Sequence, residues 1–110
     1  MKARDAIKAL NAEEIYIANE DKEITCGYVG DFLSHVMGSA PSDCAWFTIM
    51  NNVNVCAVAT LADVSLIVLC EGVHPDENLL SKVKLQGFNI ISTKLDIYNA
   101  TITFDKYLNN

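Results

Sequence analysis

The residues best suited to binding chemistry form two short polar segments, each at the end of a predicted strand. Gly27, Tyr28, Gly30 and Asp31 make up the first segment, between an alternating strand and an amphipathic helix. Glycines let a ligand approach the backbone, a tyrosine ring can stack on a flat group, and a helix N-terminus favours an anion. The alternative is a tight strand-to-helix turn, with Asp31 as an ordinary N-cap.

Asparagines form the second segment, after an apparent central strand and before a helix. Asn51, Asn52 and Asn54 carry amides that can hydrogen-bond to the edge of a base or to a sugar hydroxyl. In open α/β sheets, ligands gather outside the carboxyl ends of the strands. We therefore expect the two segments to face one cleft and to supply a ligand site, with a turn and a helix cap as the alternative for the asparagines.

Other reactive side chains give no pattern typical of a catalytic or metal site. His35 and His74 have no metal-ligating neighbour at a suitable interval, so both are expected to be ordinary surface residues. The four cysteines are widely spaced, without a CxxC or CxxH pair, and Cys56 and Cys70 lie in apolar runs typical of a core. No GxxxxGK[ST] phosphate loop and no G-x-S-x-G elbow occur. The sequence predicts a protein that is not an enzyme and uses no metal or cofactor.

Length and composition limit the class of protein. A chain of 110 residues predicts a single domain over residues 1–110, and 51% apolar residues are enough for a core at this size. A net charge of -6 argues against nucleic acid and anionic membranes as partners. No apolar run approaches the roughly 20 residues of a membrane span, and the start of the chain mixes charged and apolar residues unlike a signal peptide. We expect a cytoplasmic protein with reduced thiols.

Hydrophobic periodicity predicts helices and strands in alternation. The expected elements are a helix at 3–10, strands at 14–18 and 24–28, a helix at 31–37 stopped by Gly38, a strand at 45–50, a helix at 55–62, a strand at 65–70, a helix from Pro75 to Gly87, a strand at 88–92 and a helix from 97 to 108. Thr93 and Asp96 resemble a capping box for the last helix, and Trp46 is expected to pack in the core or at an interface. The alternation predicts one three-layer α/β/α domain with a largely parallel sheet of about four to five strands.

Five segments taken together resemble the DRTGG domain family. They are D-K-x-I-T-C-G-Y at 21–28, D-F-L-S-H-V-M-G at 31–38, N-V-C-A-V-A-T-L at 54–61, E-G-V-H-P-D-E at 71–77 and G-F-N-I-I-S-T at 87–93. They follow the order and spacing of the family and cover nearly the whole chain. Two positions depart from its pattern. Lys22 stands where the name motif has arginine, a planar bidentate donor, and Cys26 stands where it has the first glycine of its pair.

The resemblance implies an α/β fold similar to the N-terminal domain of HPr kinase/phosphorylase, and a regulatory, ligand-sensing or oligomerising role. Such domains occur beside CBS domains in regulated pyrophosphatases, within phosphotransacetylases and alone, and this chain resembles the stand-alone form. HPr kinase activity is not expected, because the phosphate loop is absent.

Three functions are compatible with these features. The first is a non-catalytic regulatory module that binds an adenine nucleotide or another small metabolite, as a homodimer or with a partner kinase or redox enzyme. The second is a pure interaction or dimerisation domain without a ligand pocket. The third, a small enzyme acting on a phosphorylated metabolite, is disfavoured by the acidic balance and the missing phosphate loop.

Overall fold

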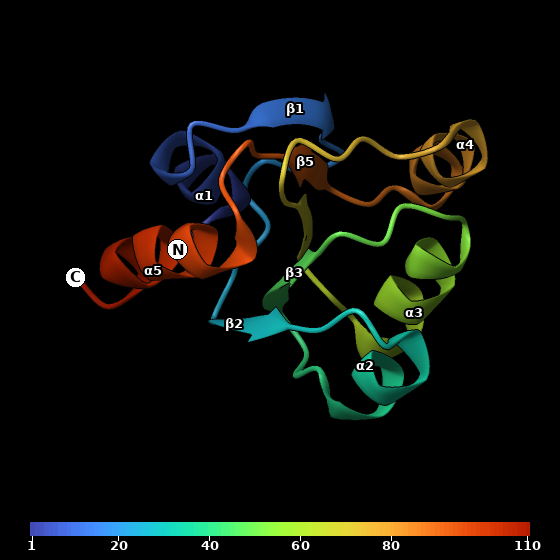
Figure 1. The fold of residues 1–110 in the computed structure, drawn as a ribbon, viewed down its shortest axis with the longest axis horizontal. Helices are drawn as coiled ribbons and strands as arrows, with labels where there is room; N and C mark the ends of the chain where they lie inside the picture. The colour runs from blue at the N-terminus through green and yellow to red at the C-terminus, as the bar shows by residue number, and fades with distance from the viewer.

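The computed structural model describes residues Met1–Asn110 as a five-stranded sheet between two helical layers (Figure 1). The helices are α1 (Ala3–Ala9), α2 (Leu33–Ser39), α3 (Asn54–Ala62), α4 (Glu77–Gln86) and α5 (Ile97–Leu108). The strands are β1 (Glu13–Tyr16), β2 (Cys26–Val29), β3 (Cys44–Thr48), β4 (Leu66–Leu69) and β5 (Ile90–Ser92). The predicted α/β class and the predicted order of elements are confirmed, while several strands are shorter than expected.

The sheet has the order β1-β5-β4-β3-β2 and is parallel except at one edge. Strands β2 to β5 pair in parallel, each beside the next in the sequence, and β1 pairs antiparallel with β5. The connections between parallel strands are almost always right-handed. When successive strands are added on the same side of the sheet, right-handed connections place all their helices on one face. Accordingly α2, α3 and α4 cover one face, and α1 and α5 cover the opposite face (Figure 1). The expectation of a largely parallel sheet is confirmed.

The two central strands are buried along their whole length. Every residue of β3 and β4 is buried, because helices cover both faces. Trp46 points into the core under α2, α3 and α4, as predicted, and the next residue, Phe47, points into the core under α1 and α5. There the rings of Phe47 and Phe104 meet edge to face, with their centroids 5.2 Å apart. Cys56 and Cys70 are also core residues, as expected.

Helix α2 begins and ends later than the sequence indicates. Its N-cap position is Phe32, which gives no side-chain cap, and the helix continues through Gly38 to Ser39. The Asp31 carboxylate instead accepts hydrogen bonds from the Thr48 hydroxyl at 2.7 Å and from the Ile49 backbone N–H at 3.0 Å. The alternative interpretation of Asp31, as an ordinary N-cap of this helix, is therefore wrong. The Asp31 carboxylate binds two donors at the end of β3 and does not accept from the first backbone N–H groups of α2.

The last helix also starts differently from the prediction. Its N-cap is Asp96, which accepts from the Asn99 backbone N–H at 2.7 Å. Thr93 is buried before the helix, where its hydroxyl donates to the Leu10 carbonyl at 3.4 Å. The Thr93–Asp96 capping box is therefore wrong, because the turn from β5 places Thr93 inside the molecule. Gly87 ends α4 as expected, with the left-handed φ of 73° that glycine adopts easily.

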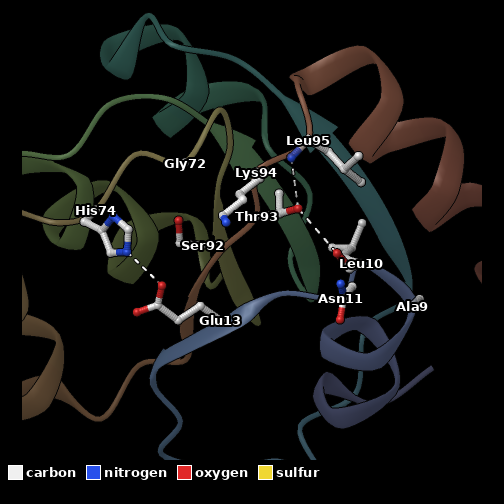
Figure 2. A pocket seen from close by; sticks show the side chains of 10 residues that line it. All are labelled: Ala9, Leu10, Asn11, Glu13, Gly72, His74, Ser92, Thr93, Lys94 and Leu95. Atoms are coloured by element: carbon white, nitrogen blue, oxygen red, sulfur yellow. Dashed lines mark hydrogen bonds and ion pairs between the residues drawn. The ribbon is translucent and has the colours of Figure 1, made fainter.

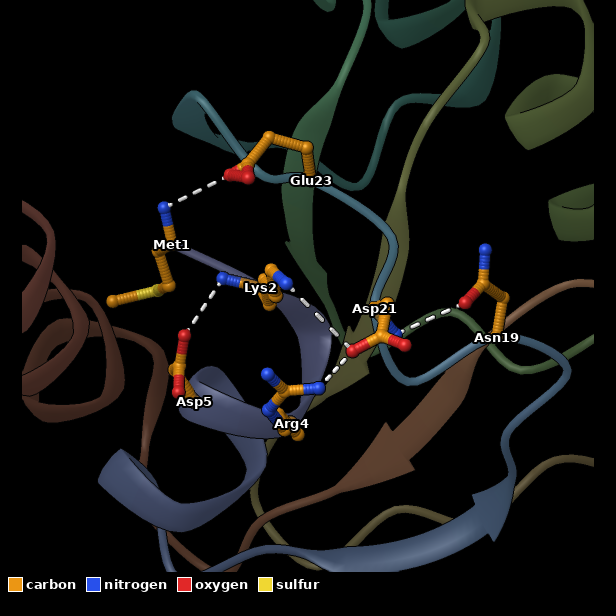
Figure 3. A network of polar contacts seen from close by, with 7 residues as sticks. All are labelled: Met1, Lys2, Arg4, Asp5, Asn19, Asp21 and Glu23. Carbon is orange, nitrogen blue, oxygen red and sulfur yellow. Dashed lines mark hydrogen bonds and ion pairs between the residues drawn. The ribbon is translucent and has the colours of Figure 1, made fainter.

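A polar network attaches α1 to the segment that precedes β2 (Figure 3). Its members are Met1, Lys2, Arg4, Asp5, Asn19, Asp21 and Glu23. The Asp21 carboxylate pairs with the Arg4 guanidinium and lies 3.9 Å from the Lys2 ammonium. Exposed ion pairs contribute only about 0–1 kcal/mol each, so the burial of Ala3, Ala6 and Leu10 is the larger contribution to docking. This docking brings the α1–β1 connection to the carboxyl end of β5.

No helix of the structure combines the length and the apolar character that crossing a bilayer requires.

Candidate ligand-binding site

A cavity of about 430 Å³ opens outside the carboxyl ends of β4 and β5 (Figure 2). Its walls come from the α1–β1 connection, the β4–α4 loop and the β5–α5 loop. The chain leaves β4 toward α4 on one face of the sheet and leaves β5 toward α5 on the other face. Ligands of open α/β sheets gather where neighbouring connections diverge in this way. We call this cavity the switch-point pocket.

Most side chains that line the switch-point pocket are polar. Only three of its ten lining residues are hydrophobic, and the polar side chains are those of Asn11, Glu13, His74, Ser92, Thr93 and Lys94. A pocket with this lining suits a charged or hydrogen-bonding ligand better than an apolar one.

An ion pair closes one side of the pocket. Glu13 Oε1 lies 2.9 Å from His74 Nε2, and this hydrogen bond to the carboxylate, together with its charge, raises the pKa of His74. Because β1 runs antiparallel to β5, its first residue, Glu13, lies at the carboxyl end of β5. The Asn51 side-chain amide donates to the His74 carbonyl at 2.9 Å, so the β4–α4 loop is held from two directions.

Lys94 supplies a positive charge without a carboxylate partner. It follows β5 by two residues, is exposed, and takes part in none of the ion pairs. Figure 2 shows its amino group on the side of Ser92, within the ring of lining side chains. An ammonium group in this position can form a charge-assisted hydrogen bond to a phosphate or a carboxylate.

The hydroxyls of the pocket join its walls to one another. Ser92 donates to the Val73 carbonyl at 2.7 Å and so connects β5 to the β4–α4 loop. Thr93 accepts from the Leu95 backbone N–H at 3.3 Å and donates to the Leu10 carbonyl at the end of α1. These bonds fix the relative positions of the three segments that surround the cavity.

The rim beside β4 contains a strained turn. Glu71 and Gly72 have φ values of 62° and 72°, and the Val73 N–H donates to the Cys70 carbonyl at 3.1 Å. Two left-handed central residues are the mark of a type I′ turn. Glycine adopts this conformation freely, whereas for Glu71 it costs about 1 kcal/mol or more. The Glu71 N–H donates to the Leu95 carbonyl at 2.8 Å, which holds this turn against the β5–α5 loop.

The first segment singled out from the sequence lies on β2, at the opposite edge of the sheet from β1, and on the loop that follows it. Gly27 and Tyr28 line a second, more open groove of about 550 Å³ between β2 and α5. A Cβ on Gly27 would lie 3.1 Å from Phe104 Cε2, so the missing side chain leaves room for α5. The Gly30 carbonyl accepts from Trp46 Nε1 at 2.9 Å, which fixes the loop after β2.

The three asparagines lie at the predicted edge of the sheet but line neither cavity. Asn52 Oδ1 accepts from the Asn54 backbone N–H at 2.9 Å, which matches the alternative of a turn, whereas the N-cap of α3 is Val53, without a side-chain cap. Asn51 contributes indirectly, through its bond to the His74 loop. No cavity is lined by both candidate segments, so the structure does not bring them into one cleft.

Sequence reasoning did not single out Glu13, His74 and Lys94, which line the switch-point pocket. His74 was expected to be an ordinary surface histidine; it is exposed, but it pairs with Glu13 and lines the pocket. One sequence signal pointed to this place. Polar residues follow two neighbouring predicted strands, at 71–77 after the apolar strand at 65–70 and at 93–96 after the strand at 88–92. No three His, Cys, Asp or Glu side chains lie together in a way that would hold a metal ion.

Comparisons with known proteins identify a similar fold. No family model and no curated protein matches the sequence. The structure is similar to the CBS and DRTGG domains of the regulatory region of the Clostridium perfringens pyrophosphatase, solved with its activator, diadenosine tetraphosphate. The TM-score is 0.77 at 16% identity, over 97% of this chain and 47% of that chain. The fold fits a DRTGG domain.

The DRTGG-like fold agrees with the resemblance that five separate sequence segments indicate. The chain spans about half of the similar regulatory region, 47% of its length, and the likeness at 16% identity is one of fold.

Proposed function

We propose that residues 1–110 act as one regulatory, ligand-sensing domain, without enzymatic activity, that binds a small anionic metabolite in the switch-point pocket. The observation that supports this proposal is the position of Lys94, an ammonium without a carboxylate partner beside a cavity at the diverging ends of β4 and β5. The polar lining and the three cross-connected walls favour a preformed site.

An adenine nucleotide is the first ligand to test. The regulatory region with the similar fold was solved with a dinucleotide activator, and a volume of about 430 Å³ is within the range of small-molecule sites. In this proposal Lys94 binds a phosphate oxygen, and the Asn11 amide and the Glu13 carboxylate are available to the hydroxyl and amino groups of the nucleoside.

The test is a titration of 15N-labelled protein with AMP, ADP, ATP, diadenosine tetraphosphate and inorganic phosphate. We expect amide shifts at Gly72, His74 and Lys94, and a higher melting temperature for the ligand that binds best. At 100 times its dissociation constant, a ligand adds about 2.7 kcal/mol to the free energy of unfolding. Shifts confined to Gly27 and Tyr28 would move the site to the groove between β2 and α5. A panel without shifts would contradict the ligand-sensing role.

The alternative function is a dimerisation domain, and one observation favours it. Strand β2 is an open edge of the sheet, and the exposed residues Val29, at its end, and Ile102, on α5, line the second groove. A second copy could extend the sheet there, because an unpaired edge accepts another strand. Sedimentation equilibrium of the native protein and of a Val29→Lys variant tests this alternative. A native dimer that the substitution dissociates would support it, and a native monomer at high concentration would refute it.

A further inference from the structure

Cys26 and Cys44 are direct partners in the parallel ladder between β2 and β3. Partners at one position of a ladder project their side chains from the same face of the sheet. Adjacent strands lie about 4.8 Å apart, which is inside the Cα separation of about 4.4–6.8 Å that a disulfide requires. Cys44 belongs to the core under α2 and α3, and Cys26 packs against that core. Both thiols are free in the structure.

The two thiols differ in exposure. Cys26 is partly exposed, whereas Cys44, Cys56 and Cys70 are buried. The Thr25 hydroxyl donates to Cys26 Sγ at 3.8 Å. A dissolved oxidant therefore reaches Cys26 before the other three sulfurs.

Cys44 is the one buried cysteine whose pKa is raised by the charge of Cys26. Burial, and then the charge of Cys26, raise the pKa of Cys44 to about 12. Burial also raises the pKa values of Cys56 and Cys70, but the charge of Cys26 does not contribute to either shift. The Cys44 thiol is thus protonated at neutral pH.

We propose that Cys26 and Cys44 form a thiol-oxidation site, in which peroxide oxidises Cys26 and Cys44 then closes an intramolecular disulfide between β2 and β3. In the first step the Cys26 sulfur attacks one peroxide oxygen, the O–O bond breaks and water leaves, which gives a sulfenic acid. In the second step the Cys44 sulfur attacks the Cys26 sulfur and loses its proton, the S–O bond breaks and a second water leaves. Two thiols are oxidised to one disulfide while one hydrogen peroxide is reduced to two waters.

The position of β2 in the sheet permits the small movement that such a bond needs. A directly opposed pair brings its Cβ atoms less close than an unstrained disulfide prefers, so one strand must shift. Strand β2 pairs only with β3, and Cys26 is its first residue, so it can move without breaking a second ladder. A bond formed under such strain is more easily reduced, as expected for a reversible modification.

The test is peroxide treatment of the reduced native protein, followed by alkylation and mass spectrometry. Chymotrypsin is the suitable protease, because it cuts at Tyr28 and Trp46, whereas trypsin finds no site between Lys22 and Lys82. We expect the intact mass to fall by two hydrogens, a linked peptide pair containing Cys26 and Cys44, and alkylated Cys56 and Cys70. Dithiothreitol should restore all four thiols.

Two variants sharpen the result. In Cys44→Ser the sulfenic acid should persist on Cys26, where dimedone traps it, and Cys70→Ser should behave as the native protein. A link from Cys26 to Cys56 or to another chain would overturn the proposal. So would irreversible oxidation of Cys26 with Cys44 left free. If Cys44→Ser fails to fold, the peptide map of the native protein still decides between these outcomes.

Discussion

His74 Nε2 and Glu13 Oε1 lie 2.9 Å apart at the switch-point pocket, although the two residues are 61 positions apart in the sequence. The pair joins the loop after β4 to the first residue of β1. It therefore depends on the antiparallel pairing of β1 with β5, which brings Glu13 to the carboxyl edge of the parallel strands.

The stability contributed by this pair should depend on pH. Glu13 raises the pKa of His74 above its ordinary value of 6.5. Because the His74 pKa is higher in the folded than in the unfolded protein, the pair stabilises the fold fully below about pH 6.5, the pKa of the unfolded chain. This stabilisation is lost as the pH rises through the pKa of His74 in the folded protein. An NMR titration of the His74 ring should give a midpoint above 6.5.

Glu13→Gln is the matched change for that prediction. It should return the His74 midpoint toward the ordinary value, and it should destabilise the protein to urea more below pH 6 than above about pH 8. A midpoint unchanged by Glu13→Gln would show that the ion pair does not form in solution.

Lys94→Gln should weaken binding of an anionic ligand without unfolding the protein. Lys94 is exposed and makes no ion pair, so its loss should leave the melting temperature unchanged. A hydrogen bond to a charged group contributes about 1.5–3 kcal/mol, which corresponds to a loss of affinity of about 10- to 100-fold. Calorimetric titration measures this loss, and Lys106→Gln, at the second groove, is the control with expected native affinity.

The bond between Asp31 and Thr48 should stabilise the fold rather than bind ligand. Asp31→Ala leaves the buried Thr48 hydroxyl without its acceptor, which should lower the free energy of unfolding by about 1–2 kcal/mol. Urea unfolding of Asp31→Ala, Thr48→Val and the double variant gives their coupling. Additive effects would contradict a direct interaction between these two side chains.

Two glycines should respond in opposite ways to a larger side chain. Gly38 lies within α2 and a Cβ there meets nothing within 4 Å, so Gly38→Ala should stabilise the protein by about 0.5–1 kcal/mol. Gly27→Val should destabilise it by about 1–3 kcal/mol, because the new side chain meets the Phe104 ring. Thermal unfolding measures both changes, and loss of stability in Gly38→Ala would contradict the helical position of Gly38.

The sequence was sufficient for the class of fold because its strongest signals are local. The apolar run at 65–70 predicted a strand, and β4 lies there and is buried along its whole length. Gly87 predicted the end of α4 correctly. Asp31 and Thr93 were misassigned because each is bound by a residue far along the chain, Thr48 and Leu10 respectively. Local capping rules do not account for such competing partners.

The candidate site depended on information that local patterns lack. The sequence predicted polar residues at the carboxyl edge of the sheet, and Asn51 does lie beside the loop that forms the pocket wall. Which two strands diverge there depends on the order β1-β5-β4-β3-β2, and that order is a property of the assembled sheet. Glu13 could be assigned to this edge only after the antiparallel direction of β1 was known.

The helical layer formed by α1 and α5 has a consequence for biosynthesis. These helices are the first and the last of the ten elements, and together they cover Phe47, Val68 and Ile91 on one face of the sheet. A ribosome must therefore complete the whole sheet, and then the final helix, before this apolar face is shielded from water. Until α5 emerges, the nascent chain presents a surface that other unfolded chains or chaperones can bind.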